Sequence, residues 1–161
     1  MPSTLKSTSV LAALALAAGG SIATDVAAPD EAQAATSSNV TAWSSDREAA
    51  ADLAESRVGK TPYSYGGTSL WKGVDCSGLT QEVYRRQGVS LPRTTGQQKS
   101  AVRSIHQTWL RKGDLVFYGD YHVGIYVGDG YIVDAPSSGR MVEKRKMWSS
   151  GDRSFGTLRP A

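Results

Sequence analysis

Cysteine is almost absent from this sequence, and histidine is scarce: there is one cysteine, Cys76, and there are two histidines in 161 residues. A single cysteine cannot form a disulfide within the chain, and with two histidines at these spacings it matches no zinc-binding pattern. A phosphate-binding loop is also missing, because Gly66-Gly67 is not followed by Lys-Ser or Lys-Thr. The sequence therefore implies no metal and no other cofactor, and nucleophilic catalysis is the leading use for the thiol.

Apolar runs long enough to cross a membrane are missing as well. Residues 10–18 are Val, Leu and Ala only, well short of the roughly 20 residues that span a bilayer. A positively charged N-terminus precedes this run, and small residues with an Ala32-Gln33-Ala34 cleavage pattern follow it. This layout predicts a secretory signal peptide over residues 1–34, and hence a secreted or cell-wall-associated protein. An N-terminal anchor that is never cleaved is the alternative.

The rest of the chain predicts one domain. Residues 35–45 are mostly Ala, Thr, Ser and Asn, which predicts a flexible leader. Residues 46–161 then have the usual size of a single domain, and they contain no internal repeat. The sequence leaves the oligomeric state open, with a monomer as the expectation.

Excess acidic charge is absent: the formal net charge is +3. A moderately basic secreted protein is drawn to anionic surfaces such as acidic cell-wall polymer. Nucleic acid is the other common partner of basic proteins, but no basic stripe with interleaved aromatic residues supports it. We interpret the run Lys144-Arg145-Lys146 as a solvated strand end.

Hydrophobic periodicity changes along the chain from a helical period to a period of two. A capping box at Ser45 to Glu48 predicts a helix that ends at Gly59, and a second helix is expected over residues 76–87 with Gly88 as its end. A loop covers residues 62–73, and a turn with a short helix is expected at 92–99. Strands are predicted at 115–118, 122–127 and 131–133, and less clearly at 141–145 and 155–158; Asp129-Gly130 predicts a tight hairpin. Helices followed by an antiparallel sheet indicate an α+β fold.

Cys76 and His122 are the candidate catalytic pair. Cys76 stands at a helix start, where the dipole favours a thiolate, and His122 opens a strand. A protonated His122 would stabilise the thiolate further and could protonate a leaving amine. The alternative readings are a small buried hydrophobe for Cys76 and a core histidine for His122. His106 lies in a polar stretch without a motif and is expected at the surface.

Five sequence blocks resemble the signature blocks of the NlpC-type cell-wall cysteine peptidases. In chain order, they are Pro62-Tyr63-Ser64-Tyr65-Gly66-Gly67, Asp75-Cys76-Ser77-Gly78, Leu91-Pro92-Arg93-Thr94-Thr95, Lys112-Gly113-Asp114-Leu115-Val116-Phe117 and His122-Val123-Gly124-Ile125-Tyr126-Val127-Gly128. The resemblance covers about residues 46–161. It implies a papain-like fold, in which the nucleophile helix packs on a central antiparallel sheet. It also implies endopeptidase activity on peptidoglycan stem peptides, typically at a γ-D-glutamyl bond to a diamino acid.

The resemblance also implies roles for residues around the pair. Family members most often have His at the third catalytic position, where this chain has Asp134; a carboxylate there could accept a hydrogen bond from Nδ1 of His122 and orient the ring. A turn residue at a strand end is the alternative for Asp134. The N–H of Cys76 and the hydroxyl of Tyr63 are the expected oxyanion donors.

The residues beside the nucleophile allow two roles. Asp75 fits the N-cap of the Cys76 helix, and substrate contact by Asp75 and Ser77 is the alternative. Arg93 fits an internal ion pair, with an acidic stem peptide as the other partner. Asp114 is expected to anchor the turn before its strand.

The sequence thus predicts a secreted cysteine endopeptidase that forms a thioester at Cys76. Two other functions are compatible with it. One is a different acyl transfer on the same scaffold, such as amidase cleavage where the glycan meets the peptide. The other is a non-catalytic module that binds the cell wall, against which the presence of both Cys76 and His122 argues.

Overall fold

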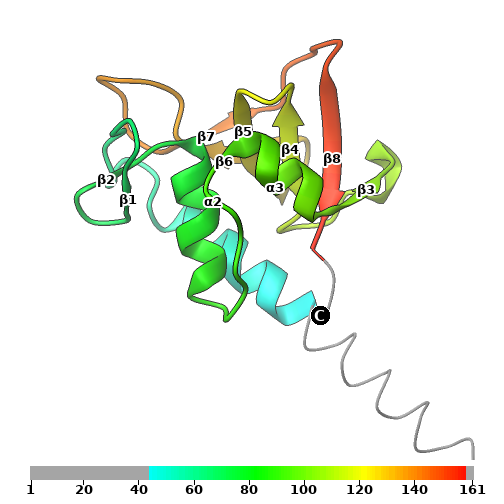
Figure 1. The fold of residues 1–161 in the computed structure, drawn as a ribbon, viewed down its shortest axis with the longest axis horizontal. Helices are drawn as coiled ribbons and strands as arrows, with labels where there is room; N and C mark the ends of the chain where they lie inside the picture. The colour runs from blue at the N-terminus through cyan, green and yellow to red at the C-terminus, as the bar shows by residue number, and fades with distance from the viewer. Residues whose placement is uncertain (1–43, 159–161) are drawn as a thin grey trace, which may run out of the picture.

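A six-stranded antiparallel sheet is the centre of the fold (Figure 1). The computed structural model describes residues 44–158, so the predicted signal peptide and almost all of the predicted leader lie outside the described residues. The strands lie in the order β3-β8-β4-β5-β6-β7. Their bounds are β3 Arg103–Ile105, β4 Leu115–Tyr118, β5 His122–Gly128, β6 Tyr131–Asp134, β7 Glu143–Lys146 and β8 Arg153–Thr157. The α+β fold predicted from the periodicity is confirmed.

The helices lie near the positions that the apolar periodicity predicts, but the first helix has neither the predicted N-cap at Ser45 nor the predicted end at Gly59. A first helix covers residues 44–55, so Ser45 is inside it and is not its N-cap. A Ser-x-x-Glu pattern fits a first helical turn as well as a cap, which is why the pattern misled. Helix α2 is Cys76–Arg85, and Gly88 follows it with a φ of +78°. Helix α3, Thr95–Ala101, begins with a capping box between Thr94 and Gln97.

The three shortest strands were not predicted. Strand β3 is an edge strand with exposed residues, and β1 Thr68–Ser69 and β2 Gly73–Val74 form a two-stranded sheet inside the predicted loop. None of these segments carries an apolar alternation that a sequence reading could detect. The predicted hairpin is confirmed, since Asp129 and Gly130 join β5 to β6 with φ values of 52° and 78°, as a type I′ turn requires.

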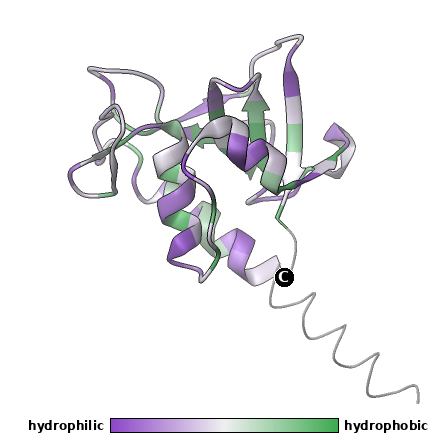
Figure 2. Cartoon of the chain, viewed as in Figure 1, coloured by the Kyte–Doolittle hydropathy of each residue, from purple (hydrophilic) through white to green (hydrophobic). Residues whose placement is uncertain are grey.

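Both faces of the central strands are covered. Helix α2 places Leu79 and Val83 in the main core with Val123 and Ile125 of β5. On the other face, a second cluster combines buried residues of β4 and β6 with partly buried residues that include Trp148. Figure 2 shows apolar residues gathered on these central strands, while α2 carries both polar and apolar residues. Among residues 44–158, no helix combines the length and the apolar character that a membrane crossing requires.

Candidate active site

Cys76 is the first residue of α2, and Asp75 is the N-cap, as the sequence predicts. One carboxylate oxygen of Asp75 accepts a hydrogen bond from the N–H of Gly78 at 2.7 Å, and the other accepts one from Gly66 at 2.9 Å. The cap satisfies an N–H that the helix itself leaves without a partner. A Cβ at position 78 would clash with the carbonyl of Gly67, so the Asp-Cys-Ser-Gly run holds the thiol on a tightly packed helix start.

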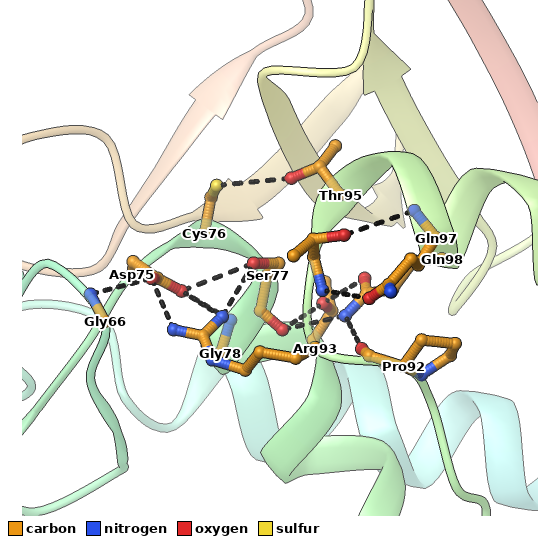
Figure 3. A network of polar contacts seen from close by, with 12 residues as sticks. Gly66, Asp75, Cys76, Ser77, Gly78, Pro92, Arg93, Thr95, Gln97 and Gln98 are labelled. Atoms are coloured by element: carbon orange, nitrogen blue, oxygen red, sulfur yellow. Dashed lines mark hydrogen bonds and ion pairs between the residues drawn. The ribbon is translucent and has the colours of Figure 1, made fainter.

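Arg93 locks this cap from the side (Figure 3). Its two terminal nitrogens donate to the two oxygens of Asp75 at 3.0 and 2.5 Å, and one of them also donates to Ser77 Oγ at 2.9 Å. Burial raises the pKa of Asp75, but the hydrogen bonds from Arg93 and from Gly78 and Gly66 outweigh it and lower the pKa. Both oxygens therefore already accept donors of the protein, and Arg93 forms the internal ion pair that the sequence allowed.

The thiol of Cys76 points away from this network toward α3 and the turn before β5 (Figure 3). Its sulfur lies 3.8 Å from Thr95 Oγ1 and 3.9 Å from the carbonyl oxygen of Tyr121. Burial raises the pKa of the thiol, but the hydrogen bond and the charge of His122 outweigh burial and lower it overall. Cys76 thus has the environment of an activated thiol rather than that of an inert buried one.

His122, the first residue of β5, links the thiol to Asp134. Its Nε2 lies 2.5 Å from Oδ2 of Asp134. The expectation that Nδ1 would contact Asp134 is therefore wrong. Because a carboxylate only accepts, Nε2 carries the proton, and Nδ1 is left for the thiol. Burial lowers the pKa of His122, but the hydrogen bonds to Asp134 and Cys76 outweigh it and raise the pKa to about 9.

The strand register explains why His122 reaches Asp134. Ile125 of β5 pairs with Val133 of β6, so Gly124 lies beside Asp134, and His122 is its diagonal neighbour on the same face. A Cβ at Gly124 would lie 3.3 Å from the Cβ of Asp134 and closer still to Ile132. The glycine in the His-Val-Gly run therefore leaves room for the imidazole and the carboxylate to meet.

Arg145 is also part of the site, although it was not predicted to be. Its Nε lies 3.1 Å from each oxygen of Asp134, and one terminal nitrogen also contacts Oδ2. The interpretation of Lys144-Arg145-Lys146 as a solvated strand end is therefore wrong for Arg145. The signal was a period of two: in β7 the side chains of 143 and 145 are partly buried, while those of 144 and 146 are exposed.

An open cleft of about 390 Å³ exposes the thiol. Tyr63 lies in its wall near Cys76, and burial together with the negative charge of the thiolate raises the pKa of the Tyr63 hydroxyl. Tyr65 and Tyr121 also line the cleft and are largely exposed. The remaining lining residues are Gly66, Asp75, Ser77, Arg93, Thr94, Thr95 and Asp120.

The other residues singled out from the sequence lie outside this cleft. His106 is exposed and caps the short 3-10 helix η1, Gln107–Trp109. Asp114 anchors its turn as predicted, accepting from the N–H of Arg111 at 2.8 Å and pairing with Arg47 at 3.2 Å. In the part of the chain that the structure describes, no three His, Cys, Asp or Glu residues are grouped so that they could hold a metal ion.

Comparison with known proteins gives consistent matches. The model of the NlpC/P60 family matches residues 59–155. The γ-D-glutamyl-L-lysine dipeptidyl-peptidase of Bacillus cereus is 37% identical over 89 residues, which are 51% of this chain and 26% of that protein. The chain spans about a third or less of the length of the curated relatives it matches.

Two solved structures from Mycobacterium tuberculosis share the fold. The peptidoglycan hydrolase RipB superposes with a TM-score of 0.65 at 29% identity, over 73% of this chain and 66% of that one. RipD, described as a non-catalytic NlpC/P60 domain protein adapted to peptidoglycan binding, superposes with a TM-score of 0.60 at 25% identity, over 71% of this chain and 98% of that one. The same scaffold is thus associated with both hydrolysis and binding.

Proposed function

Because the chain belongs to the NlpC/P60 family, we propose that it is a secreted cysteine endopeptidase that hydrolyses peptidoglycan stem peptides. The observation that carries this proposal is that the thiol of Cys76, whose pKa His122 lowers, lines an open cleft, while Nε2 of His122 lies 2.5 Å from Oδ2 of Asp134. A thiolate next to an imidazolium is the arrangement that acyl transfer by a cysteine needs. Export through a signal peptide at residues 1–34 belongs to the same proposal.

In the first half of the reaction, the thiolate of Cys76 attacks the carbonyl carbon of the scissile bond. The tetrahedral intermediate collapses when Nδ1 of the His122 imidazolium gives its proton to the leaving nitrogen, and the carbon–nitrogen bond breaks. The product amine leaves, and a thioester joins the acyl group to the sulfur. Asp134 accepts the hydrogen bond from Nε2 and so holds the ring whether or not Nδ1 of His122 carries a proton.

In the second half, neutral His122 accepts a proton from water through Nδ1, and the resulting hydroxide attacks the thioester. The carbon–sulfur bond breaks, and the thiolate and imidazolium are restored. The N–H of Cys76 is one donor for the oxyanion in both halves, because the first residue of a helix has no intrahelical acceptor for it. The hydroxyl of Tyr63, in the wall of the same cleft, is the second proposed donor.

The bond we propose is the γ-D-glutamyl bond to a diamino acid, which the name of the Bacillus cereus relative specifies for that protein. A dipeptidyl-peptidase must recognise a free chain end, and a carboxylate beside the nucleophile is the natural partner for an amine. Here Asp75 already accepts from Arg93, Gly66 and Gly78. Because these donors already occupy both oxygens of Asp75, the carboxylate is not free to bind the amine of a free chain end. This supports cleavage within a stem peptide that is still attached to glycan.

Digestion of defined peptidoglycan fragments, followed by mass spectrometry, tests this proposal. We expect disaccharide-linked stems to lose the part after D-glutamate and to keep a shortened stem on the sugar. A free, complete stem peptide would instead identify an amidase. Binding to purified wall without any product would identify a module of the RipD kind, and the Cys76→Ala variant supplies the matched blank.

The thiolate–imidazolium pair of Cys76 and His122 predicts a bell-shaped pH dependence of kcat/KM. The lower limb follows the lowered pKa of Cys76, and the upper limb follows His122 at about 9. The raised pKa also links His122 to folding: its pairing stabilises the fold fully below a pH of about 6.5, and this contribution is lost as the pH rises through about 9. Rate profiles and thermal unfolding between pH 5 and 10 measure both, and an upper limb near that of a free histidine would contradict the pairing.

A further inference from the structure

The carboxylate of Asp134 is fully buried and lies between two cationic groups. Its Oδ2 contacts Nε2 of His122 on one side and the guanidinium of Arg145 on the other. A terminal nitrogen of Arg145 lies 3.4 Å from Nε2 of His122. A buried carboxylate requires compensation of its charge, and an arginine compensates it without itself titrating.

Arg145 is itself held by an aromatic stack. Its Cζ lies 4.3 Å from the ring centre of Trp148, and that ring stacks on Tyr118 with centroids 3.6 Å apart and planes 5° apart. Tyr118 of β4 pairs with His122 of β5 in the sheet. The guanidinium is therefore braced against the same strand pair that carries the imidazole, which defines its position relative to Nε2.

We propose that Arg145 is a positioning residue for the reaction, one that fixes the carboxylate of Asp134 against His122 and offsets its negative charge. The inference rests on the proposed role of His122 as acid and base. An uncompensated buried carboxylate would hold the imidazolium proton too firmly for transfer to a leaving amine. Paired with Arg145, Asp134 still orients the ring, but its charge holds the imidazolium proton less firmly than an unpaired carboxylate would.

The other charged or titratable groups around this pair come from four elements. Cys76 of α2 interacts with His122, and Glu143 of β7 lies 3.6 Å from Nε of Arg145. Tyr118 of β4 stacks on Trp148, and Arg153 of β8 donates to the carbonyl oxygen of Trp148 at 2.9 Å. None of these four groups forms a hydrogen bond with the carboxylate of Asp134, whose partners among the described residues are His122 and Arg145.

The test compares Arg145→Gln with Arg145→Lys, using Lys146→Gln as the matched control. Lys146 is the next residue on β7 and is exposed, so its substitution removes the same charge without touching Asp134. Two readouts need no substrate: the pH profile of iodoacetamide labelling at Cys76, and the titration of His122 by NMR. His106, the exposed second histidine, serves as the internal reference in the spectra.

For Arg145→Gln, we expect the upper limb of the kcat/KM profile and the NMR titration of His122 to move up by about one pH unit. The reason is that the Asp134–His122 pair binds its proton more tightly without the arginine. The activity near neutral pH should fall about 10-fold. Arg145→Lys and Lys146→Gln should leave the limb within about 0.3 units of the unmodified protein.

An unchanged upper limb in Arg145→Gln, or an equal shift in Lys146→Gln, would overturn the inference. If Arg145→Gln does not fold, Arg145→Lys decides: a limb displaced upward by about one unit despite the retained charge rejects the role of the charge. Failure of the proposed function is distinguishable, because a chain that binds wall without cleaving it would still show these labelling and NMR titrations.

Discussion

Replacement of Cys76 by alanine is expected to remove peptidoglycan hydrolysis, with a loss of at least about 10⁴-fold in kcat. The thiol forms the thioester, and alanine offers no nucleophile. Cys76→Ser should be nearly as inactive, because a hydroxyl is not ionised by a neighbouring imidazolium. Fragment digestion monitored by mass spectrometry measures the effect.

The fold should survive the change, because the cap at Asp75 and the core face of α2 do not depend on the sulfur. Circular dichroism and thermal unfolding are the controls. Since Cys76 is the only cysteine, intact mass after iodoacetamide should show one adduct in the unmodified protein and none in Cys76→Ala. Activity above about a hundredth of the original in either variant would rule out covalent catalysis by this thiol.

Asp134→Asn is expected to lower kcat by roughly 10- to 1000-fold with little change in KM, less than the ~10⁴-fold known for the matching change in a serine protease. A thiolate is the better nucleophile and depends less on the orienting group. The asparagine oxygen could still accept from His122, but its NH₂ would then face the donors of Arg145, so we also expect a loss of about 1–3 kcal/mol in stability.

The pH profile gives this prediction a direction. Hydrogen bonding to Asp134 is the strongest of the influences that raise the pKa of His122 to about 9, so the upper limb should move down in Asp134→Asn. This is opposite to the shift expected for Arg145→Gln. Asp129→Asn is the matched control, because Asp129 is an exposed turn residue with a positive φ that asparagine accepts. Equal kcat and equal limbs in both variants would mean that Asp134 only ends its strand.

The two hydrophobic periods in the chain were enough to predict the layout of the fold. Helix α2 and strands β4, β5 and β6 carry the buried side chains that produce a period, and each was predicted within two residues. Strands β1, β2 and β3 are only two or three residues long, too short to show a period, and hydrogen bonds to their partner strands define them rather than a side-chain pattern. Their pairing depends on residues distant in the sequence, which a local pattern does not contain.

In the candidate site, too, the features that depend on local sequence were predicted and those that depend on strand pairing were not. The sequence by itself determined the thiol at the start of a helix, the imidazole at the start of a strand and the Asp75 cap, because each depends on neighbours within a few residues. Only the tertiary structure decided that Nε2 rather than Nδ1 contacts Asp134 and that Arg145 completes the site. These contacts arise where β5, β6 and β7 pair in register, and sheet register is established by packing across the whole domain.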